Sequence, residues 1–358
     1  MNNGITYKIA GVDINAGNES VKRIKSHVHS TFNESVLTGI GTFGAIYNLE
    51  DVIRRYKNPV LVQSIDGVGT KFMIARAMGI YTTIGIDIVA HSCNDILCQG
   101  AKPITFLDYI ATEKVKPENI EDIVKGIAEG CRDAGMPVIG GEIAELPGIY
   151  MSGEYDLVGS ITGVVEKDKI ITGDRIRKGD GIIGIASSGL HTNGYTLARK
   201  VLFSHRGYTV KTYLNELGVM LGEELLKPHR NYSKVIHSMM DGSAFRQAQG
   251  SPSIEVKGIA HITGGGFIDN IPRILPDNCT AVIRKGSWEL LPIFDIIQRE
   301  GNVPEEDMFR TLNMGIGLVI IVPHNDLDDA LGHINNSGFK SWEIGVIEEG
   351  QKGVRLIG

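Results

Sequence analysis

The sequence lacks three features that would assign it to a common class of protein. It has no excess of basic residues, and its formal net charge of −6 argues against nucleic-acid binding as its main role. No apolar run approaches the ~20 residues of a membrane-spanning helix, and no cationic segment precedes an apolar block, so we expect no membrane partner. The four cysteines form no C-x-x-C pair, which favours reduced thiols and a cytoplasmic location.

A Walker A loop is also absent, yet one segment has the composition of a nucleotide site. The apolar run 60–62 predicts a buried strand, and Asp66-Gly67-Val68-Gly69-Thr70-Lys71 follows it, before the helical pattern 72–78. The carboxylate could hold Mg²⁺, the glycine turn could present N–H groups to phosphate, and the lysine could neutralise its charge. The alternative is an ordinary strand-to-helix turn with a surface lysine.

A second glycine-rich segment, 39–44, formally matches the G-x-G-x-x-G pattern. Dinucleotide binding would require a strand directly before this pattern and a helix that begins within it. Residues 30–38 are mostly polar, and no βαβ pattern follows. We therefore expect no dinucleotide site here.

Helical and strand patterns alternate along the chain. Helical spacing predicts a helix over 19–32 with Asn18 as its N-cap, and another over 117–134 that ends at Gly135. A strand is predicted over 137–139, broken by Gly140-Gly141.

At 358 residues the chain is long for a single core and typical of two domains. The segment 172–180 is charged and rich in turn residues, and a predicted strand over 182–186 follows it. We place the boundary there, which gives domains 1–172 and 173–358.

Two stretches, 77–101 and 133–166, contain no lysine or arginine. Helical spacing over 82–99 places polar side chains four residues apart on one face of the first stretch. Solvated helix faces usually mix charges, so the carboxylates within these two stretches need a counter-charge from elsewhere. Mg²⁺ carrying ATP phosphates would supply it, as would lysines distant in the sequence. The residues concerned are Asp87, His91 and Asp95 in the first stretch and Glu142 in the second.

Two loops of the second domain, 187–195 and 261–267, combine histidine, hydroxyl and glycine residues. Glycine lets the backbone approach a ligand closely, and N–H groups at a helix N-terminus attract phosphate. A single histidine is more often structural, but two such loops in one domain favour an anion site. The candidate residues are His191, Thr192, Asn193, Gly194, His261, Thr263, Gly264 and Gly265.

Taken in order, these segments resemble the phosphoribosylformylglycinamidine cyclo-ligases, also called aminoimidazole ribonucleotide synthetases. The resemblance runs collinearly from about Tyr7 to the C-terminus, and the ordered set is far more specific than any one fragment. The matching segments are 7–18, 43–45, 66–71, 85–87, 94–95, 106–109, 140–142, 147–150, 188–195 and 263–267. The departures from the family's usual residues are Thr42, Ile65, Ile143, Met314 and Ile316.

The resemblance implies an α+β fold of two domains, whose N-terminal domains pair into a homodimer with a shared β-barrel. It implies a ligase of purine biosynthesis that uses ATP and Mg²⁺ to close formylglycinamidine ribonucleotide to aminoimidazole ribonucleotide. In this reaction ATP phosphorylates the formamide oxygen, and the ribosyl-bearing amidine nitrogen then attacks the activated carbon. Such chemistry needs positioning and charge neutralisation more than a protein nucleophile.

The resemblance also implies roles for individual residues. Lys71, His191 and Asp95 are the expected catalytic residues, and the second-domain loops would hold the ribonucleotide. The expected Mg²⁺ ligands are Asp66, Asp87, Asp95 and Glu142. The expected ATP-binding residues are Asp13, Asn18, Lys25, Gly67, Gly69, Thr70, Lys71 and Asn94.

Two alternatives stay open. The chain could be another ATP-using member of the same superfamily, of the selenophosphate synthetase or thiamine-phosphate kinase type. Selenophosphate synthetases usually carry a reactive cysteine in a glycine-rich N-terminal segment, which this sequence lacks. The chain could also be a non-catalytic nucleotide-binding subunit of a purine-enzyme complex, although it retains Lys71 and every candidate metal carboxylate.

Overall fold

The computed structural model describes residues 4–241 and 254–358, which form two compact units. Unit 1 consists of residues 4–93 and 103–166, and unit 2 consists of 94–102 together with the described part of 167–358. The chain passes from unit 1 to unit 2 for the last time between residues 166 and 167, a few residues before the predicted boundary at 172/173. Helix α4 (Thr82–Leu97) was not expected to contribute to both units, yet its last turn belongs to unit 2.

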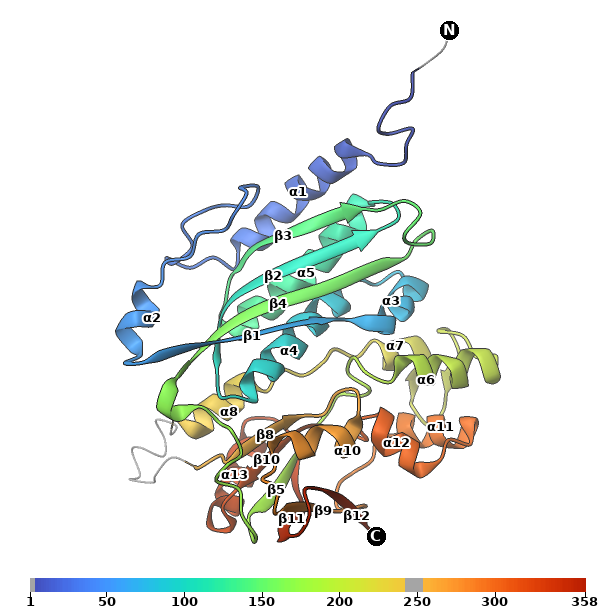
Figure 1. The fold of residues 1–358 in the computed structure, drawn as a ribbon. Coiled ribbons are helices and arrows are strands. Elements are labelled where there is room, and N and C mark those ends of the chain that lie inside the picture. The colour runs from blue at the N-terminus through green and yellow to red at the C-terminus, as the bar shows by residue number, and fades with distance from the viewer. Residues whose placement is uncertain (1–3, 242–253) are drawn as a thin grey trace. The chain divides into compact units, whose positions relative to one another are not determined.

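Unit 1 is built on a four-stranded sheet with the strand order β1-β4-β2-β3, and α1, α4 and α5 lie on one face of it (Figure 1). β1 pairs antiparallel with β4, whereas β2 and β3 are parallel. The expectation that β1 is buried is wrong: it is an edge strand, and Leu61 and Ile65 are exposed. The strands are β1 (Pro59–Gly67), β2 (Lys102–Thr112), β3 (Val138–Glu145) and β4 (Tyr155–Glu166).

The helices of unit 1 follow the predicted pattern except at the start of the first one. The prediction for 117–134 is confirmed, and Gly135 ends that helix in the left-handed conformation. Asn18 is not an N-cap, because α1 begins earlier, where the Asp13 side chain accepts the N–H of Asn15. The helices are α1 (Ile14–His29), α2 (Glu50–Arg55), η1 (Gly69–Lys71), α3 (Phe72–Met78), α4 and α5 (Pro117–Ala134).

Helices α4 and α5 approach each other so closely that their backbones touch. A Cβ added at Gly126 would lie 1.9 Å from the carbonyl oxygen of Thr82, and one added at Gly85 would lie 2.1 Å from that of Ile123. Only glycine allows this approach. The contact fixes the part of α4 that carries Asp87.

Unit 2 contains a six-stranded sheet with the order β12-β9-β11-β5-β10-β8. The predicted strand 182–186 is confirmed as β5, whose six residues are all buried between β10 and β11. The strands of this sheet are β5 (Gly181–Ala186), β8 (Gly258–His261), β9 (Cys279–Arg284), β10 (Ile316–Val322), β11 (Ser341–Glu349) and β12 (Gly353–Ile357). A separate two-stranded sheet is formed by β6 (Tyr213–Leu214) and β7 (Val219–Met220).

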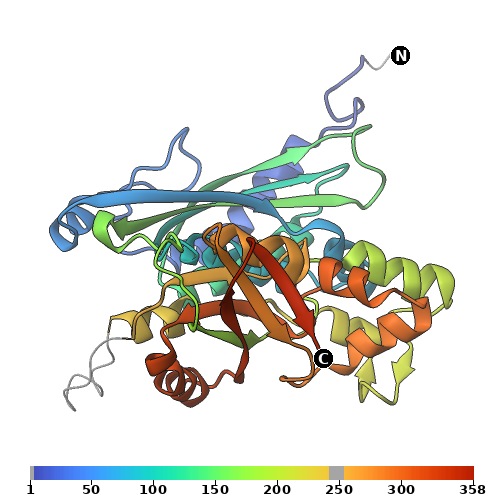
Figure 2. The same cartoon turned by 60° about the horizontal axis from the view of Figure 1, so that its bottom comes forward.

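The main core of unit 2 lies between this sheet and the helices α8 and α13 (Figure 2). Ile236 of α8 and Ile334 of α13 pack there with Ile183, Leu318 and Ile320. The helices of unit 2 are η2 (Lys167–Lys169), α6 (Tyr195–Arg199), η3 (Lys200–His205), α7 (Leu221–Leu225), α8 (Ser233–Met240), α10 (Gly266–Asn270), η4 (Ile271–Ile274), α11 (Pro292–Gly301), α12 (Glu305–Thr311), η5 (His324–Asp326) and α13 (Leu327–Asn336).

Two features of the chain, membrane-spanning helices and disulfides, concern the residues that the structure describes. None of their helices has the length and apolar composition needed to cross a membrane. All four cysteines are among them, and each is a free thiol.

Candidate functional site

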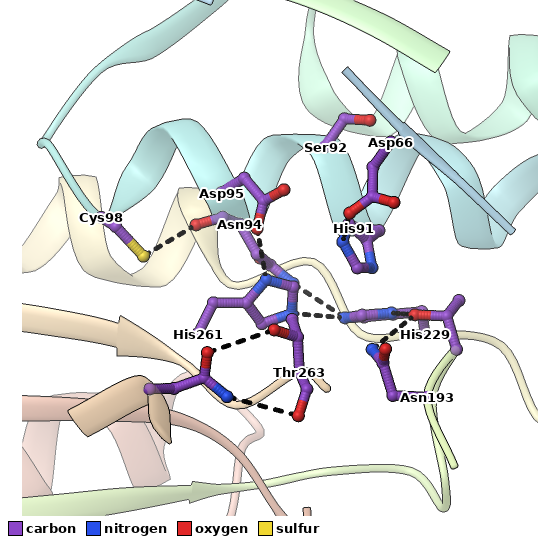
Figure 3. A network of polar contacts seen from close by, with 12 residues as sticks. Asp66, His91, Ser92, Asn94, Asp95, Cys98, Asn193, His229, His261 and Thr263 are labelled. Carbon is purple, nitrogen blue, oxygen red and sulfur yellow. Dashed lines mark hydrogen bonds and ion pairs between the residues drawn. The ribbon is translucent and has the colours of Figure 1, made fainter. Parts of the chain in front are cut away.

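Asp66 lies near the end of β1 with its carboxylate partly exposed. One oxygen accepts the N–H of Gly67 at 2.7 Å, and the other lies 2.7 Å from Nε2 of His91, a buried residue of α4 (Figure 3). The following turn contains Gly69 in the left-handed conformation and is accessible to solvent. A carboxylate beside an open glycine turn is suited to a cation that carries phosphate.

Lys71 is not a surface lysine, which was the alternative interpretation of this segment. Its side chain is fully buried in unit 1, and its Nζ lies 2.7 Å from Oδ2 of Asp87, which is also fully buried. Burial lowers the pKa of Lys71, and the neighbouring carboxylate opposes this shift. In this conformation each side chain is paired with the other, which does not favour direct contact with phosphate or Mg²⁺, and the predicted roles of Lys71 and Asp87 stay predictions. The alternative, a lysine distant in the sequence, is right for Asp87.

A cavity of about 780 Å³ lies within unit 1 between α1, the glycine-rich segment 39–45 and the strands β2 and β3. Glu142 and Asp108 line it, and burial raises the pKa of Asp108 to about 7. The predicted break at Gly140-Gly141 is wrong, because β3 continues through both glycines. Gly141 pairs with Asp108, and a Cβ at position 141 would lie 2.3 Å from Oδ1 of that carboxylate. A residue with a side chain would therefore clash with Asp108, whereas glycine fits.

The four predicted metal carboxylates do not form one cluster. Asp66 and Glu142 lie on β1 and β3, which are opposite edges of the same sheet. Three strand spacings of ~4.8 Å separate these edges by about 14 Å, too far for one ion to bind both side chains within a protomer. Of the predicted set, Asp66 and Glu142 remain as accessible carboxylates of unit 1.

The predicted ATP residues near the N-terminus lie on or beside α1. Asp13 caps this helix and forms an ion pair of 2.7 Å with Lys8, whose hydrogen bond lowers the pKa of Asp13. Asn18 and Lys25 are exposed and lie two turns apart on α1. Asp13, Asn18 and Lys25 therefore all lie on or next to one helix of unit 1.

The two predicted loops of unit 2 lie next to each other. His191 follows β5, adopts φ 62°, and accepts the N–H of Ser188 at its Nε2 at 3.2 Å. A Cβ added at Gly264 in the second loop would lie 3.3 Å from Oδ1 of Asn193 in the first. Thr192 and His261 are buried, whereas Asn193, Gly194, Thr263, Gly264 and Gly265 are partly or fully exposed.

Sequence reasoning missed His229, which connects these two loops. Its ring stacks on that of His191 with centroids 3.9 Å apart, and its Nδ1 lies 3.3 Å from Oγ1 of Thr192. Its Nε2 lies 3.0 Å from Nε2 of His261 (Figure 3). His229 stands in a polar stretch without periodicity or glycine, so no local signal marked it.

Asn94 and Asp95 belong to the same network in unit 2. Nδ1 of His261 lies 2.8 Å from Oδ1 of Asp95. Asn94 is buried, and it donates to the Arg230 carbonyl at 2.8 Å and accepts the N–H of Tyr232 at 3.0 Å. Its amide thus holds segment 229–232 in place, and the ATP contact at Asn94 stays a prediction.

Comparison with known proteins decides the family. The family model described as AIR synthase related protein, N-terminal domain, matches residues 49–165, and the corresponding C-terminal domain model matches 177–357. A phosphoribosylformylglycinamidine cyclo-ligase from Thermoanaerobacter sp. (strain X514) is 50% identical over 352 residues, which cover 98% of this chain and 100% of the relative. This chain belongs to the phosphoribosylformylglycinamidine cyclo-ligase family. A further cyclo-ligase, from Carboxydothermus hydrogenoformans, is 49% identical over 98% of each chain.

Solved structures share the fold of this cyclo-ligase family member at low sequence identity. Thiamine-monophosphate kinase from Stenotrophomonas maltophilia superimposes with a TM-score of 0.68 at 18% identity, covering 95% of this chain and 96% of the kinase. The hydrogenase maturation protein HypE in complex with ATP superimposes with a TM-score of 0.64 at 16% identity, covering 94% of this chain and 90% of HypE. The predicted α+β fold of two domains is confirmed.

Proposed function

We propose that this chain catalyses the ATP-dependent closure of formylglycinamidine ribonucleotide to aminoimidazole ribonucleotide. The observation that carries the proposal is identity of about 50% to cyclo-ligases along nearly the whole chain. The accessible carboxylates of unit 1 and the pair of histidine loops in unit 2 support it, because carboxylates bind the Mg²⁺ that accompanies ATP and glycine loops bind phosphate.

The proposed reaction has two steps. The formamide oxygen attacks the γ-phosphorus of ATP and ADP leaves, which turns the oxygen into a phosphate leaving group. The ribosyl-bearing amidine nitrogen then attacks the activated carbon, inorganic phosphate leaves, and the nitrogen loses a proton as the ring closes. Neither step requires a covalent intermediate with the protein, so its residues act by positioning the reactants and excluding water.

The two units divide the proposed work by their chemistry. In unit 1, the open turn after Asp66 presents backbone groups for ATP phosphates, and the exposed Lys25 supplies a positive charge. In unit 2, Asn193 and Gly264 present accessible polar groups to the ribonucleotide, while the buried His191 and Thr192 hold that loop in shape.

The donor set of unit 1 fits Mg²⁺ at Asp66. Mg²⁺ prefers carboxylate and phosphate oxygens, and it is usually held by one or two carboxylates together with substrate phosphates. Asp66 offers a half-exposed carboxylate, whereas Asp87 is already neutralised by Lys71. Glu142 in unit 1 and Asp95 in unit 2 stay candidate ligands, each for an ion separate from the one at Asp66. When bound, Mg²⁺ would neutralise charge on the transferred phosphate.

We also propose that unit 1 forms the homodimer. Three apolar side chains stand exposed on its sheet, Leu61 and Ile65 on β1 and Leu107 on β2. Exposed apolar residues on one sheet are typical of a surface that a partner covers. A second copy of the same sheet would bury them and would pair the open edges.

The experiment that tests the proposed activity is an assay with purified protein, formylglycinamidine ribonucleotide and Mg–ATP. We expect aminoimidazole ribonucleotide, ADP and phosphate in equal amounts. Thiamine monophosphate serves as the control substrate for a kinase of the same fold. Phosphorylation of that control, without formation of the imidazole, would contradict the proposal.

A further inference from the structure

The segment 309–317, which joins the end of α12 to β10, contacts both of the loops proposed to bind the ribonucleotide. In the loop 187–195, a Cβ added at Gly194 would lie 2.1 Å from a side-chain atom of this segment. In the loop 261–267, a Cβ added at Gly266 would lie 2.0 Å from one of its carbonyl oxygens. Both loops therefore pack against the same short segment, at positions where only glycine fits.

Asn313 lies in the middle of this segment and is only 2% exposed. Its Nδ2 donates to the carbonyl oxygen of Gly189 at 2.9 Å. Its Oδ1 accepts the N–H of Gly315 at 2.9 Å and lies 3.2 Å from the hydroxyl of Ser187. Because a carbonyl needs a donor and an N–H needs an acceptor, only one orientation of the amide satisfies both neighbours. This amide thus connects the start of the loop 187–195 to the turn that precedes β10.

The backbone is held in an unfavourable conformation on both sides of this connection. His191 in the loop has φ 62°, and Met314 next to Asn313 has φ 48°. Among the non-glycine residues that the structure describes, only Asn302 shares a positive φ. Such residues keep a left-handed conformation only where their surroundings fix it, and they are concentrated at ligand sites. Here the indole N–H of Trp288 donates to the Met314 carbonyl at 2.8 Å, beside the contacts of the Asn313 amide.

We propose that Asn313 is a positioning residue for the ribonucleotide. It fixes the loop 187–195 in the shape that presents the accessible Asn193 and Gly194, and because it is buried it acts only through that loop. This role rests on the proposed function. It concerns the ribonucleotide rather than ATP, because Asn313 and its hydrogen-bond partners all belong to unit 2.

The test compares the KM values of Asn313→Asp for the two substrates. The variant keeps the size of the side chain and the acceptor for Gly315, but an oxygen replaces the donor that faces the Gly189 carbonyl. Two acceptors that face each other repel, so the loop should shift. We expect the KM for the ribonucleotide to rise at least about tenfold and the KM for ATP to stay within about twofold of wild type. A purely structural defect would instead lower the fraction of active protein and leave both KM values unchanged.

Asn335→Asp is the matched control, because Oδ1 of Asn335 accepts the N–H of Ser341 at 2.9 Å in the same unit but outside both loops. It should leave both KM values unchanged. Thermal melting shows whether each variant folds, and if Asn313→Asp does not, Ser187→Ala replaces it. This variant keeps the Asn313 amide and removes the hydroxyl beside it, so the KM for the ribonucleotide should rise about threefold or more. An unchanged KM in the variant that is used, or an equal rise in the control, would overturn the role of Asn313.

Hydrogen exchange of the loop 187–195, measured without substrate, gives a second readout. Exchange should be faster in Asn313→Asp, or in Ser187→Ala where that variant is used, and unchanged in Asn335→Asp. Unaltered exchange in the loop would contradict the role of Asn313. A wild-type protein that forms no aminoimidazole ribonucleotide would instead contradict the proposed function, so the two failures are distinguishable.

Discussion

The ion pair of Lys71 and Asp87 shows that a residue with a functional pattern in the sequence can also have a structural partner in the fold. Lys71 follows a glycine turn that suits phosphate, but the 3₁₀ turn η1 directs its side chain into unit 1. The carboxylate that it meets comes from a stretch of sequence without any cation. Each charge is therefore buried only because the other is present.

Lys71→Met should destabilise the fold strongly, because it leaves Asp87 buried without its counter-charge. Breaking a buried ion pair in this way typically costs about 3–5 kcal/mol. The double variant Lys71→Met/Asp87→Asn should recover much of that loss, as measured by denaturant unfolding. If the single variant instead kept full stability and lost only ATP use, Lys71 would be a phosphate ligand after all.

Asp108 makes the stability of unit 1 depend on pH. Burial raises its pKa from 3.8 to about 7, so the folded state retains a proton that the unfolded state releases. This contribution is complete below about pH 4 and is lost as the pH rises through about 7. Asp108→Asn should remove it, so the melting temperature of the variant relative to wild type should be higher at about pH 8 than at about pH 5. The exposed Asp168→Asn serves as control, and an equal shift in both variants would contradict the assignment.

At the scale of elements, the crossing of α4 and α5 determines where the candidate site residues lie. α4 carries Asp87 and His91, and its last turn contributes Asn94 and Asp95 to unit 2. The position of this helix depends on the backbone contact at Gly85 and Gly126. A displacement of α4 would therefore move ligand-binding candidates in both units.

Gly126→Ala should be poorly tolerated, because its Cβ would lie 1.9 Å from the Thr82 carbonyl oxygen. We expect a loss of about 3 kcal/mol or more, since only backbone movement can relieve the clash. Gly332→Ala is the matched control: this glycine lies in α13 and a Cβ there would meet nothing within 4 Å. The control should be neutral or more stable by about 0.5–1 kcal/mol. Similar unfolding free energies for the two variants would refute the contact.

The elements that the sequence predicted well are those with local signals. The helix 117–134 has apolar residues at helical spacing, proline at its first position and Gly135 at its end, and the fold keeps all three features. β5 is a short apolar run between turns, and it is buried as expected. The start of α1 was missed because capping by Asp13 competes with an equally plausible cap at Asn18.

The candidate site was predictable only where its chemistry was local. The loops at His191 and His261 are marked by glycines, and the structure brings them together. His229 acts through partners that are distant in the sequence, so its role arises only from tertiary packing. The same holds for Asn94, whose amide bonds segment 229–232.

At the scale of the whole molecule, the exposed apolar side chains of unit 1 predict self-association. Leu61→Glu would place a charge at the centre of the proposed interface, where two copies would lie close together. We expect light scattering to report a dimer for wild type and a shift toward monomer for the variant. Lys57→Glu, at an exposed site before β1, is the control for added negative charge. A variant that stays dimeric would place the interface elsewhere.

The proposed division of work between the two units is tested by comparing a variant of unit 2 with a variant of unit 1. His191→Ala removes the ring that stacks on His229, and so disturbs the loops of unit 2, to which both residues belong. The KM for the ribonucleotide should rise or kcat should fall, while ATP binding measured without that substrate stays nearly unchanged. Asp66→Asn should do the reverse and weaken Mg–ATP use, because it removes the negative charge that unit 1 offers at that turn. Loss of ATP binding in His191→Ala, with ribonucleotide binding intact, would show that the histidine loops serve the nucleotide and would reverse the assignment.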